Sequence, residues 1–477
     1  MPEVKTNSFF IARKADLLEQ FHIQRTRLGF DTRVIVTARY TGGGRLNRET
    51  LWPALAEILQ HHRALSTQVH DASSKHPTFV YLGSVNLSKV VRFHDVDDRP
   101  LDAILDSYLL RPFEFETALP LWEMGVLQDN TVIFTYQHAI GDGQSGLAFH
   151  RLLLSALNSD ETPLRPLADI VPIPDTLELV APLEKMTKLS VPFSLACYQY
   201  LKIFAPVSWR KLGSAWTGNN VPRDKTAYTM TRLWDLTPDQ TTKLMCICRD
   251  QKSTLTSFAH TAVVVVVSSL LDRAPKRHKY LCTEIPVSLR RFTGVPATEL
   301  CDHVSMMYFY PPLINFPEIS RDWKASAILF PWDVSARMVP AMRKKIAKSR
   351  GEPGSLKLLF GRIRPYLESK MGKKRDGTLT LSNLGPFPPP SPEESYQNLE
   401  EERWFIDQMF FAQGDPILAP AISLGIVGAE SGSLSFCWNW GKDGIEDEFM
   451  EEVVEGFKQL VGAVLKYTPE KLGEVKA

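Results

Sequence analysis

The sequence predicts an α/β protein built from two large units. The chain has 477 residues, of which 44% are hydrophobic and 23% are charged, so it holds enough apolar material for large cores. Strand-like and helix-like patterns alternate in both halves of the chain. A polar, turn-forming stretch lies between the halves, so we expect an N-terminal unit at 1–213, a crossing linker at 214–226 and a C-terminal unit at 227–477.

The first half opens with a helix followed by a strand. Residues 17–30 have apolar side chains at helical spacing, and residues 31–40 alternate and are rich in β-branched residues. A second helix is expected after Asn47, which suits the N-cap position. Two further strand-like runs, 121–127 and 131–139, are separated by three turn-forming residues and predict a hairpin.

The second half repeats this organisation. Thr237 is placed to cap a helix, and strands are predicted at 279–289, 378–385 and, as a pair around a glycine turn, 423–440. Residues 253–274 carry five consecutive valines, which favour a strand by propensity, but about 18 residues without a breaker favour a helix. We therefore expect a helix there.

Charge and composition limit the partners. Lys plus Arg is 55 and Asp plus Glu is 54, which argues against a general nucleic-acid binder and favours a small-molecule partner for a monomeric protein. The six scattered cysteines and the absence of an apolar leader predict a cytoplasmic protein. Residues 183–209 are rich in aromatics among spaced lysines. They predict a buried or domain-bridging helix or, as an open alternative, peripheral contact with an internal membrane or lipid droplet.

The segment that points to chemistry follows the second strand of the predicted hairpin. It reads Tyr-Gln-His-Ala-Ile-Gly-Asp-Gly at 136–143, with His138 at the strand end and Asp142 four residues later. An imidazole can accept a proton near neutral pH, which suits deprotonation of an alcohol, amine or thiol that attacks an acyl carbonyl. A histidine at a strand end is more often structural, so the spacing alone leaves both readings open.

This segment resembles the His-x-x-x-Asp-Gly motif of the CoA-dependent acyltransferase superfamily, which includes chloramphenicol acetyltransferase, plant BAHD acyltransferases, condensation domains and fungal alcohol acetyltransferases. The fungal alcohol acetyltransferases match best. The plant Asp-Phe-Gly-Trp-Gly motif is missing, and Gln137 stands where condensation domains usually have a second histidine. Supporting segments occur in the family's order at 17–29, 254–260, 286–290, 381–385, 411–416 and 425–436.

The resemblance implies two chloramphenicol acetyltransferase-like α/β sandwich domains with a tunnel between them. His138 would be the general base that lets a small-molecule alcohol attack an acyl-CoA, in particular acetyl-CoA, in a ternary complex. The resemblance implies acyl-CoA as co-substrate, no covalent acyl-enzyme and no permanently bound cofactor. Three alternatives stay open: N-acylation of an amine, a condensation-type module that docks a carrier protein, and a degenerate binding domain without turnover.

The same resemblance assigns supporting roles. Asp142 would pair with Arg290 and lock the loop that aims His138, and Gly143 would let that loop turn tightly. Ser382 and Asn383 would lie along the tunnel as hydrogen-bond donors to the developing oxyanion, although a polar strand end explains them equally well.

Two further patterns concern ligands. Residues 340–376 contain twelve Lys or Arg against three acids. This charge predicts either a basic rim that binds CoA, with Lys373, Lys374 and Arg375, or simply a solvated helical face. No metal site is expected from His61, His62, His70 and His76, because adjacent helical residues face apart and no further ligand stands at the required spacing.

Overall fold

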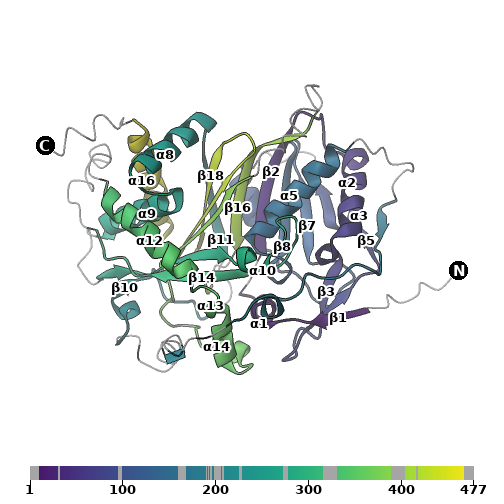
Figure 1. Ribbon diagram of the computed structural model, residues 1–477, viewed down its shortest axis with the longest axis horizontal. Helices are drawn as coiled ribbons and strands as arrows, with labels where there is room; N and C mark the ends of the chain where they lie inside the picture. The colour runs from purple at the N-terminus through teal and green to yellow at the C-terminus, as the bar shows by residue number, and fades with distance from the viewer. Residues whose placement is uncertain are drawn as a thin grey trace.

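The structure is a computed structural model of two lobes that lie side by side, each a β-sheet covered by helices (Figure 1). The chain order runs from the right-hand lobe of the figure to the left-hand one. The residues that the structure describes are 10–30, 33–94, 99–159, 168–189, 191, 193, 196–197, 206, 209–224, 228–271, 278–314, 330–387, 403–414 and 417–466.

The first lobe has a five-stranded sheet in the order β16-β2-β8-β7-β6, in which only the β6–β7 pair is parallel. Its strands are β2 (Arg33–Thr41), β6 (Val91–Phe93), β7 (Trp122–Val126), β8 (Thr131–Gln137) and β16 (Phe405–Gly414). Its helices are α1 (Leu17–Arg27), α2 (Arg48–His61), α3 (Leu87–Val90), α4 (Leu101–Leu109) and α5 (Gly143–Leu157). Two small sheets join β1 (Phe10–Lys14), β4 (Thr78–Tyr81) and β3 (Thr67–His70), and β5 (Ser84–Asn86) with β9 (Ile170–Pro172).

The second lobe has a six-stranded mixed sheet in the order β11-β18-β17-β15-β13-β14. Its strands are β11 (Thr229–Leu236), β13 (Thr283–Ser288), β14 (Val304–Phe309), β15 (Leu379–Pro386), β17 (Ile422–Gly428) and β18 (Leu434–Gly441). The main helices are α8 (Pro238–Asp250), α9 (Leu255–Leu271), α12 (Trp332–Ile346) and α16 (Asp447–Lys466). Shorter elements are α6 (Leu183–Met186), α10 (Arg290–Thr293), α13 (Gly351–Gly354), α14 (Ile363–Glu368) and the pair β10 (Ala215–Trp216) and β12 (Tyr280–Leu281).

One strand ties the two lobes together. β16 comes from the second half of the chain but forms the edge of the first lobe's sheet, antiparallel to β2. It also passes close to β17, where a Cβ at Gly425 would lie 2.2 Å from the carbonyl oxygen of Phe411. A division of the chain into 1–213 and 227–477 does not anticipate this crossover, because strand pairing at long sequence separation leaves no local signal.

The local predictions are confirmed where the structure describes them. The valine run is the buried centre of α9, and Val263 to Val267 are at most 1% exposed. Burial on all sides therefore outweighs the modest helix cost of β-branched residues. Asn47 and Thr237 cap α2 and α8, and β7 and β8 form the expected hairpin.

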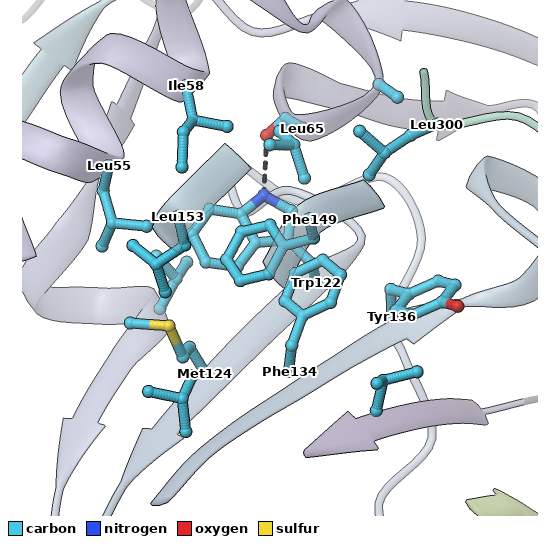
Figure 2. Packing of buried hydrophobic residues seen from close by; sticks show 14 of the residues in the cluster. Leu55, Ile58, Leu65, Trp122, Met124, Phe134, Tyr136, Phe149, Leu153 and Leu300 are labelled. Carbon is cyan, nitrogen blue, oxygen red and sulfur yellow. Dashed lines mark hydrogen bonds between the residues drawn. The ribbon is translucent and has the colours of Figure 1, made fainter. Parts of the chain in front are cut away.

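An aromatic cluster supports the strand that leads to the motif (Figure 2). Phe134 on β8 stacks on Phe149 of α5 with ring centroids 3.6 Å apart, and Trp122 packs beside both. The Trp122 indole N–H donates to the Leu65 carbonyl, so its one polar atom is satisfied. This core fixes β8 and α5 relative to each other, and the segment between them therefore has little freedom.

Two sequence predictions concern membranes and thiols. Within the described part of the chain, no single helix has the length and apolarity to cross a membrane, and only α8 and α9 together, bent by 90°, pass that test. Most of residues 190–208, and so most of the 183–209 segment, lies outside the described residues. Its described members Phe193 and Trp209 are 84% and 81% exposed. All six cysteines carry free thiols.

Candidate active site

The motif lies at the corner between β8 and α5. β8 ends at Gln137, His138 begins a single 3-10 turn, and α5 begins at Gly143. Helix α5 therefore starts inside the motif itself, because Asp142 is its N-cap. A larger residue at 143 would make Leu384 shift, since a Cβ there would lie 2.6 Å from Cδ2 of that leucine.

Asp142 is held by donors from three directions. Its Oδ1 accepts from the Ser145 amide at 3.1 Å, from the Ser145 hydroxyl at 3.1 Å and from the Arg290 guanidinium at 3.0 Å. The carboxylate is 2% exposed. Its own carbonyl accepts from the Tyr136 hydroxyl at 2.7 Å, which connects the loop to the aromatic core. Asp142 is therefore an architectural group rather than a proton carrier.

Arg290 belongs to the second half of the chain and joins the corner from α10. One guanidinium nitrogen donates to the carbonyls of Pro296 and Glu299, at 3.1 and 2.7 Å, and the other reaches Asp142 and the Ser145 hydroxyl. Burial works against its charge, but the neighbouring Asp142 carboxylate offsets this and the pKa of Arg290 is raised. The predicted Asp142–Arg290 pair is thus present, with a single direct nitrogen–oxygen contact rather than two parallel ones.

His138 faces a second carboxyl group that the sequence did not reveal. Its Nδ1 lies 3.6 Å from Oδ1 of Asp302, and Nε2 of His22 lies 3.4 Å from Oδ2 of the same residue. The two imidazoles stack with centroids 3.9 Å apart and an interplanar angle of 2°. His22, His138 and Asp302 are all buried, and we call them the histidine–aspartate cluster.

Burial controls protonation in this cluster. It lowers the pKa of His138 to about 4, with its own backbone carbonyl and Asp142 working in the opposite direction. Burial also lowers the pKa of His22 well below its ordinary value and raises that of Asp302 well above it. Burial thus favours the uncharged form of all three groups, and a neutral His138 has a nitrogen lone pair available as a base.

A small pocket lined by residues from both halves of the chain borders the cluster. Its lining includes Arg13, Phe79, Ile140, Asp302 and His303. The pocket lies next to the 3-10 turn that carries His138. The tunnel between the lobes that the resemblance implies stays a prediction.

The end of β15, which carries the oxyanion candidates Ser382 and Asn383, lies against the motif. Leu384 accepts a hydrogen bond at its carbonyl from the Gln144 side chain at 2.9 Å, so the end of β15 touches the start of α5. Asn383 donates to the Thr256 hydroxyl at 3.0 Å and accepts from the Gly385 amide at 2.9 Å, and Ser382 is 8% exposed. Asn383 thus shapes the strand end, and an oxyanion role for these two residues stays a prediction.

The three basic residues proposed for CoA divide into different environments. Arg375 is 1% exposed and donates to the carbonyls of Ile417 and Ala419, so the expectation of an exposed phosphate contact is wrong for this residue. Lys374 donates to the carbonyl of Ala215 at 2.6 Å. Lys373 is exposed and stays a candidate. Sequence patterning gives the charge of such a run but not its orientation.

Sequence reasoning missed His22, Ser145 and Asp302. His22 lies in the opening segment that carried part of the resemblance, and its signal was a histidine in an otherwise well-formed amphipathic helix. Ser145 follows the motif by two residues at the N3 position of a capped helix, where a hydroxyl can reach the cap. Asp302 is a single acid in no recognisable pattern, and only the fold brings it to His138.

Solved structures with the same fold indicate the class of protein. The trichothecene 15-O-acetyltransferase from Fusarium sporotrichioides superposes with a TM-score of 0.66 over 95% of this chain and 94% of that one, at 11% identity. The first condensation domain of the calcium-dependent antibiotic synthetase superposes with a TM-score of 0.61 over 96% and 97%, at 12% identity. The chain therefore has the two-lobed fold of acyltransferases and condensation domains.

Within that class the chain belongs to the alcohol acetyltransferase family, whose model matches residues 14–461. A relative from Aspergillus fumigatus named "Probable alcohol acetyltransferase crmB" is 25% identical over 86% of this chain and 89% of that protein. Another from Fusarium pseudograminearum, named "Probable alcohol acetyltransferase FCK4", is 22% identical over 84% and 83%. The protein is an acyl-transferring enzyme, and the family implies an alcohol and an acyl-CoA as its substrates.

Proposed function

We propose that this enzyme transfers an acyl group, in particular acetyl, from CoA to the hydroxyl of a small-molecule alcohol, with His138 as general base. The observation that carries the proposal is a neutral, buried imidazole at the end of β8, on a corner that the Asp142–Arg290 pair locks between the two halves of the chain. Family membership supports the acyl-transfer chemistry.

The reaction proceeds in one ternary complex. The acceptor hydroxyl donates its proton to the free ring nitrogen of His138 as its oxygen attacks the thioester carbonyl. The tetrahedral intermediate then collapses, the carbon–sulfur bond breaks, and the imidazolium returns the proton to the CoA thiolate. Such a base contributes about 10² to 10⁴ in rate, and the positioning of two substrates supplies much of the rest.

The arrangement between β8 and α5 supports His138 as the base, with Asp142 and Gln137 in structural roles. Oδ1 of Asp142 is engaged in the cap of α5 and in the ion pair, which supports the histidine as the proton acceptor. Gln137 uses its side chain to accept from the Ala139 amide inside the turn, which holds the residue before His138 in place. His138 itself is 7% exposed, so a small part of its surface stays accessible.

The test is an assay of acetyl-CoA with a panel of alcohols, following free thiol release and the ester product. Parallel wells hold matched amines and acetyl-pantetheine. Ester formation from alcohols alone supports the proposal. Faster amide formation assigns the enzyme to amines, and turnover of acetyl-pantetheine as fast as acetyl-CoA favours a carrier-linked donor. No product with any acceptor, from a folded protein that binds CoA, contradicts the proposal.

A further inference from the structure

The histidine–aspartate cluster contains buried polar atoms that have no partner. Both ring nitrogens of His22, Nδ1 of His138 and both carboxyl oxygens of Asp302 are buried without a hydrogen bond, within the part of the chain that the structure describes. Buried polar groups in native proteins are almost always paired, and leaving several unpaired at one place is costly. These atoms face one another across 3.4 and 3.6 Å, a few tenths of an ångström beyond hydrogen-bond distance.

A metal ion is one way to satisfy such a cluster, and the ring geometry argues against it. The ligating atoms of the three residues lie within 4.8 Å of one another. A metal bound by an imidazole nitrogen lies near the plane of that ring, about 2.0–2.1 Å from the nitrogen. The rings of His22 and His138 are stacked and parallel to within 2°, so no point lies in both planes. Binding a metal would require the stack to come apart.

Protons would satisfy the cluster with the ring stack intact, once the facing atoms approach by a few tenths of an ångström. A neutral carboxylic acid has one oxygen that accepts and one hydroxyl that donates. Among the described residues, the Asp302 carboxyl has only His22 and His138 within ion-pair distance and no Lys or Arg, and an ionised carboxylate without a partner is expensive to bury. The charged groups that act on the cluster from surrounding elements are Asp16, Glu19, Arg25, Asp142 and Arg290, of both signs. Burial raises the pKa of Asp302, which favours the neutral acid.

We propose that Asp302 and His22 are positioning residues that fix the tautomer of the catalytic histidine. Oδ1 of neutral Asp302 accepts the Nδ1 proton of His138, and the Asp302 hydroxyl on Oδ2 donates to Nε2 of His22. His138 then has its lone pair on Nε2, the nitrogen that takes the acceptor's proton. This arrangement pairs four of the five unpartnered atoms. The inference rests on the proposed function, and it gives the base a support distinct from the Asp142–Arg290 pair.

The fold explains why this support is rigid. His22 comes from α1, His138 from the end of β8, and Asp302 from the segment between α10 and β14, so three elements meet at one point. Figure 1 shows α1, β8 and α10 close together near the middle of the molecule, where the two lobes meet. The carbonyl of Cys301, the residue before Asp302, accepts from the Asp142 amide at 3.1 Å. The carboxyl therefore cannot drift away from the histidine without disturbing the motif.

Two replacements of Asp302 separate the proposal from a merely structural role. Asp302→Asn has the same shape and the same pattern of one acceptor and one donor, so it should keep kcat within about threefold of wild type. Asp302→Leu fills a similar space without polar atoms, and kcat should fall about 5- to 10-fold with little change in either KM, since only the fraction of His138 that keeps its lone pair on Nε2 acts as a base. His22→Phe preserves the ring stack, and kcat should fall about 3- to 10-fold.

The matched control is His150→Gln. His150 is another buried, neutral histidine of the first lobe, bonded to the Tyr40 hydroxyl and the Val36 carbonyl and in no contact with the cluster. This variant can lower stability but should leave kcat unchanged when assayed well below its melting temperature.

A spectroscopic readout tests the tautomer without any turnover. Protein labelled with ¹⁵N at histidine gives separate signals for protonated and unprotonated ring nitrogens, and the His138 signals are those lost in His138→Ala. Wild type and Asp302→Asn should show one tautomer with the proton on Nδ1, and Asp302→Leu should show a mixture. This reading still decides the question if Asp302→Leu proves too unstable to assay, because the Nε2–H tautomer in wild type overturns the proposal by itself.

The kinetic outcomes are equally decisive. A folded Asp302→Leu enzyme with wild-type kcat overturns the proposal, and so does an Asp302→Asn enzyme as impaired as Asp302→Leu, which would indicate a working carboxylate. Stoichiometric zinc in purified protein that disappears in Asp302→Asn would assign the cluster to a metal instead. Failure of the wild-type enzyme to acylate any acceptor would count against the proposed function, while the histidine spectra still report on the cluster.

Discussion

Two buried polar groups lie on either side of the motif, and they differ in how they are held. Oδ1 of Asp142 accepts from Ser145 and Arg290, and one guanidinium nitrogen of Arg290 donates to two backbone carbonyls, while Oδ2 of Asp142 and Nε of Arg290 are buried without a partner. The histidine–aspartate cluster has no hydrogen bond between its facing atoms, which lie 3.4 and 3.6 Å apart. An ion pair tied to the backbone by several hydrogen bonds holds a shape, whereas ring nitrogens without a hydrogen bond stay available to accept or hand over a proton. The comparison assigns architecture to the first group and chemistry to the second.

Loss of the base should have the largest effect. His138→Ala removes the proton acceptor, and kcat/KM should fall by about 10² to 10⁴ while CoA binding and the melting temperature change little. His138→Gln is the size-matched variant and should fall equally far. The measurement is initial-rate kinetics with acetyl-CoA and the best alcohol. Residual activity above about a tenth of wild type would remove His138 from its role.

Breaking the Asp142–Arg290 pair should lower the stability of the protein. Arg290→Met leaves the buried Asp142 carboxylate without its counter-charge, so the free energy of unfolding should fall by about 3 to 5 kcal/mol. The double variant Asp142→Asn with Arg290→Met should lose less than the sum of the two single losses, because neither charge is then stranded. Chemical denaturation of all four proteins measures the cycle.

An exposed pair provides the control for that cycle. Arg364 and Glu368 form an ion pair at 2.9 Å on α14, with both side chains about half exposed. Removing either should change the unfolding free energy by less than about 1 kcal/mol. If the buried and exposed cycles give the same coupling energy, the architectural assignment of Asp142–Arg290 fails.

The buried histidines should make the stability of the protein depend on acid. The pKa of His138 is lowered to about 4 by burial, so the histidine stays neutral in the folded protein as pH falls from 6.5, whereas it takes up a proton in the unfolded chain. The contribution of this neutral histidine to the free energy of unfolding is therefore fully present above about pH 6.5. It is lost as the pH falls to about 4, by up to about 1.4 kcal/mol per pH unit for each such histidine. His150 and His260 are lowered to about 4 by the same cause and share this behaviour.

The acid limb of kcat/KM provides the matching kinetic measurement. It should lie well below the 6.5 of a free imidazole, towards 4, because activity is lost only when His138 of the folded enzyme is protonated. Stability measured as unfolding free energy at several pH values keeps acid denaturation apart from titration of the base. An acid limb at pH 6.5 in a fully folded protein would show that His138 is solvated.

Sequence reasoning succeeded where local pattern determines structure. The hairpin that ends at the motif, the caps at Asn47 and Thr237 and the long valine-rich helix all follow from periodicity and turn chemistry. The motif itself and the Asp142–Arg290 pair were accessible through family resemblance, since both partners lie in recognisable segments.

The remainder depends on contacts at long sequence separation. Asp302 is 164 positions from His138 and belongs to no motif, so nothing local marks it as part of the site. β16 was not predicted from the sequence, and its pairing with β2 in the first lobe could not be expected, because register across about 370 residues is set by the whole fold. Burial of Arg375 is another such case, since a run of basic residues has the same sequence whether it faces water or carbonyl groups.

The basic run should have the smallest effect, and only one of its three members is suited to a test. Lys373 is exposed, whereas Lys374 donates to the Ala215 carbonyl and Arg375 is buried, so replacing all three would report mainly on folding. Lys373→Ala should raise the KM for acetyl-CoA about two- to fivefold at low salt, within the 1 kcal/mol that an exposed charge contact is worth, and leave kcat and the acceptor KM unchanged. The difference should vanish above about 0.3 M salt, where exposed charges are screened. Lys243→Ala on the exposed face of α8 is the matched control. Equal donor KM values for the two variants at low salt would assign the run to a solvated surface.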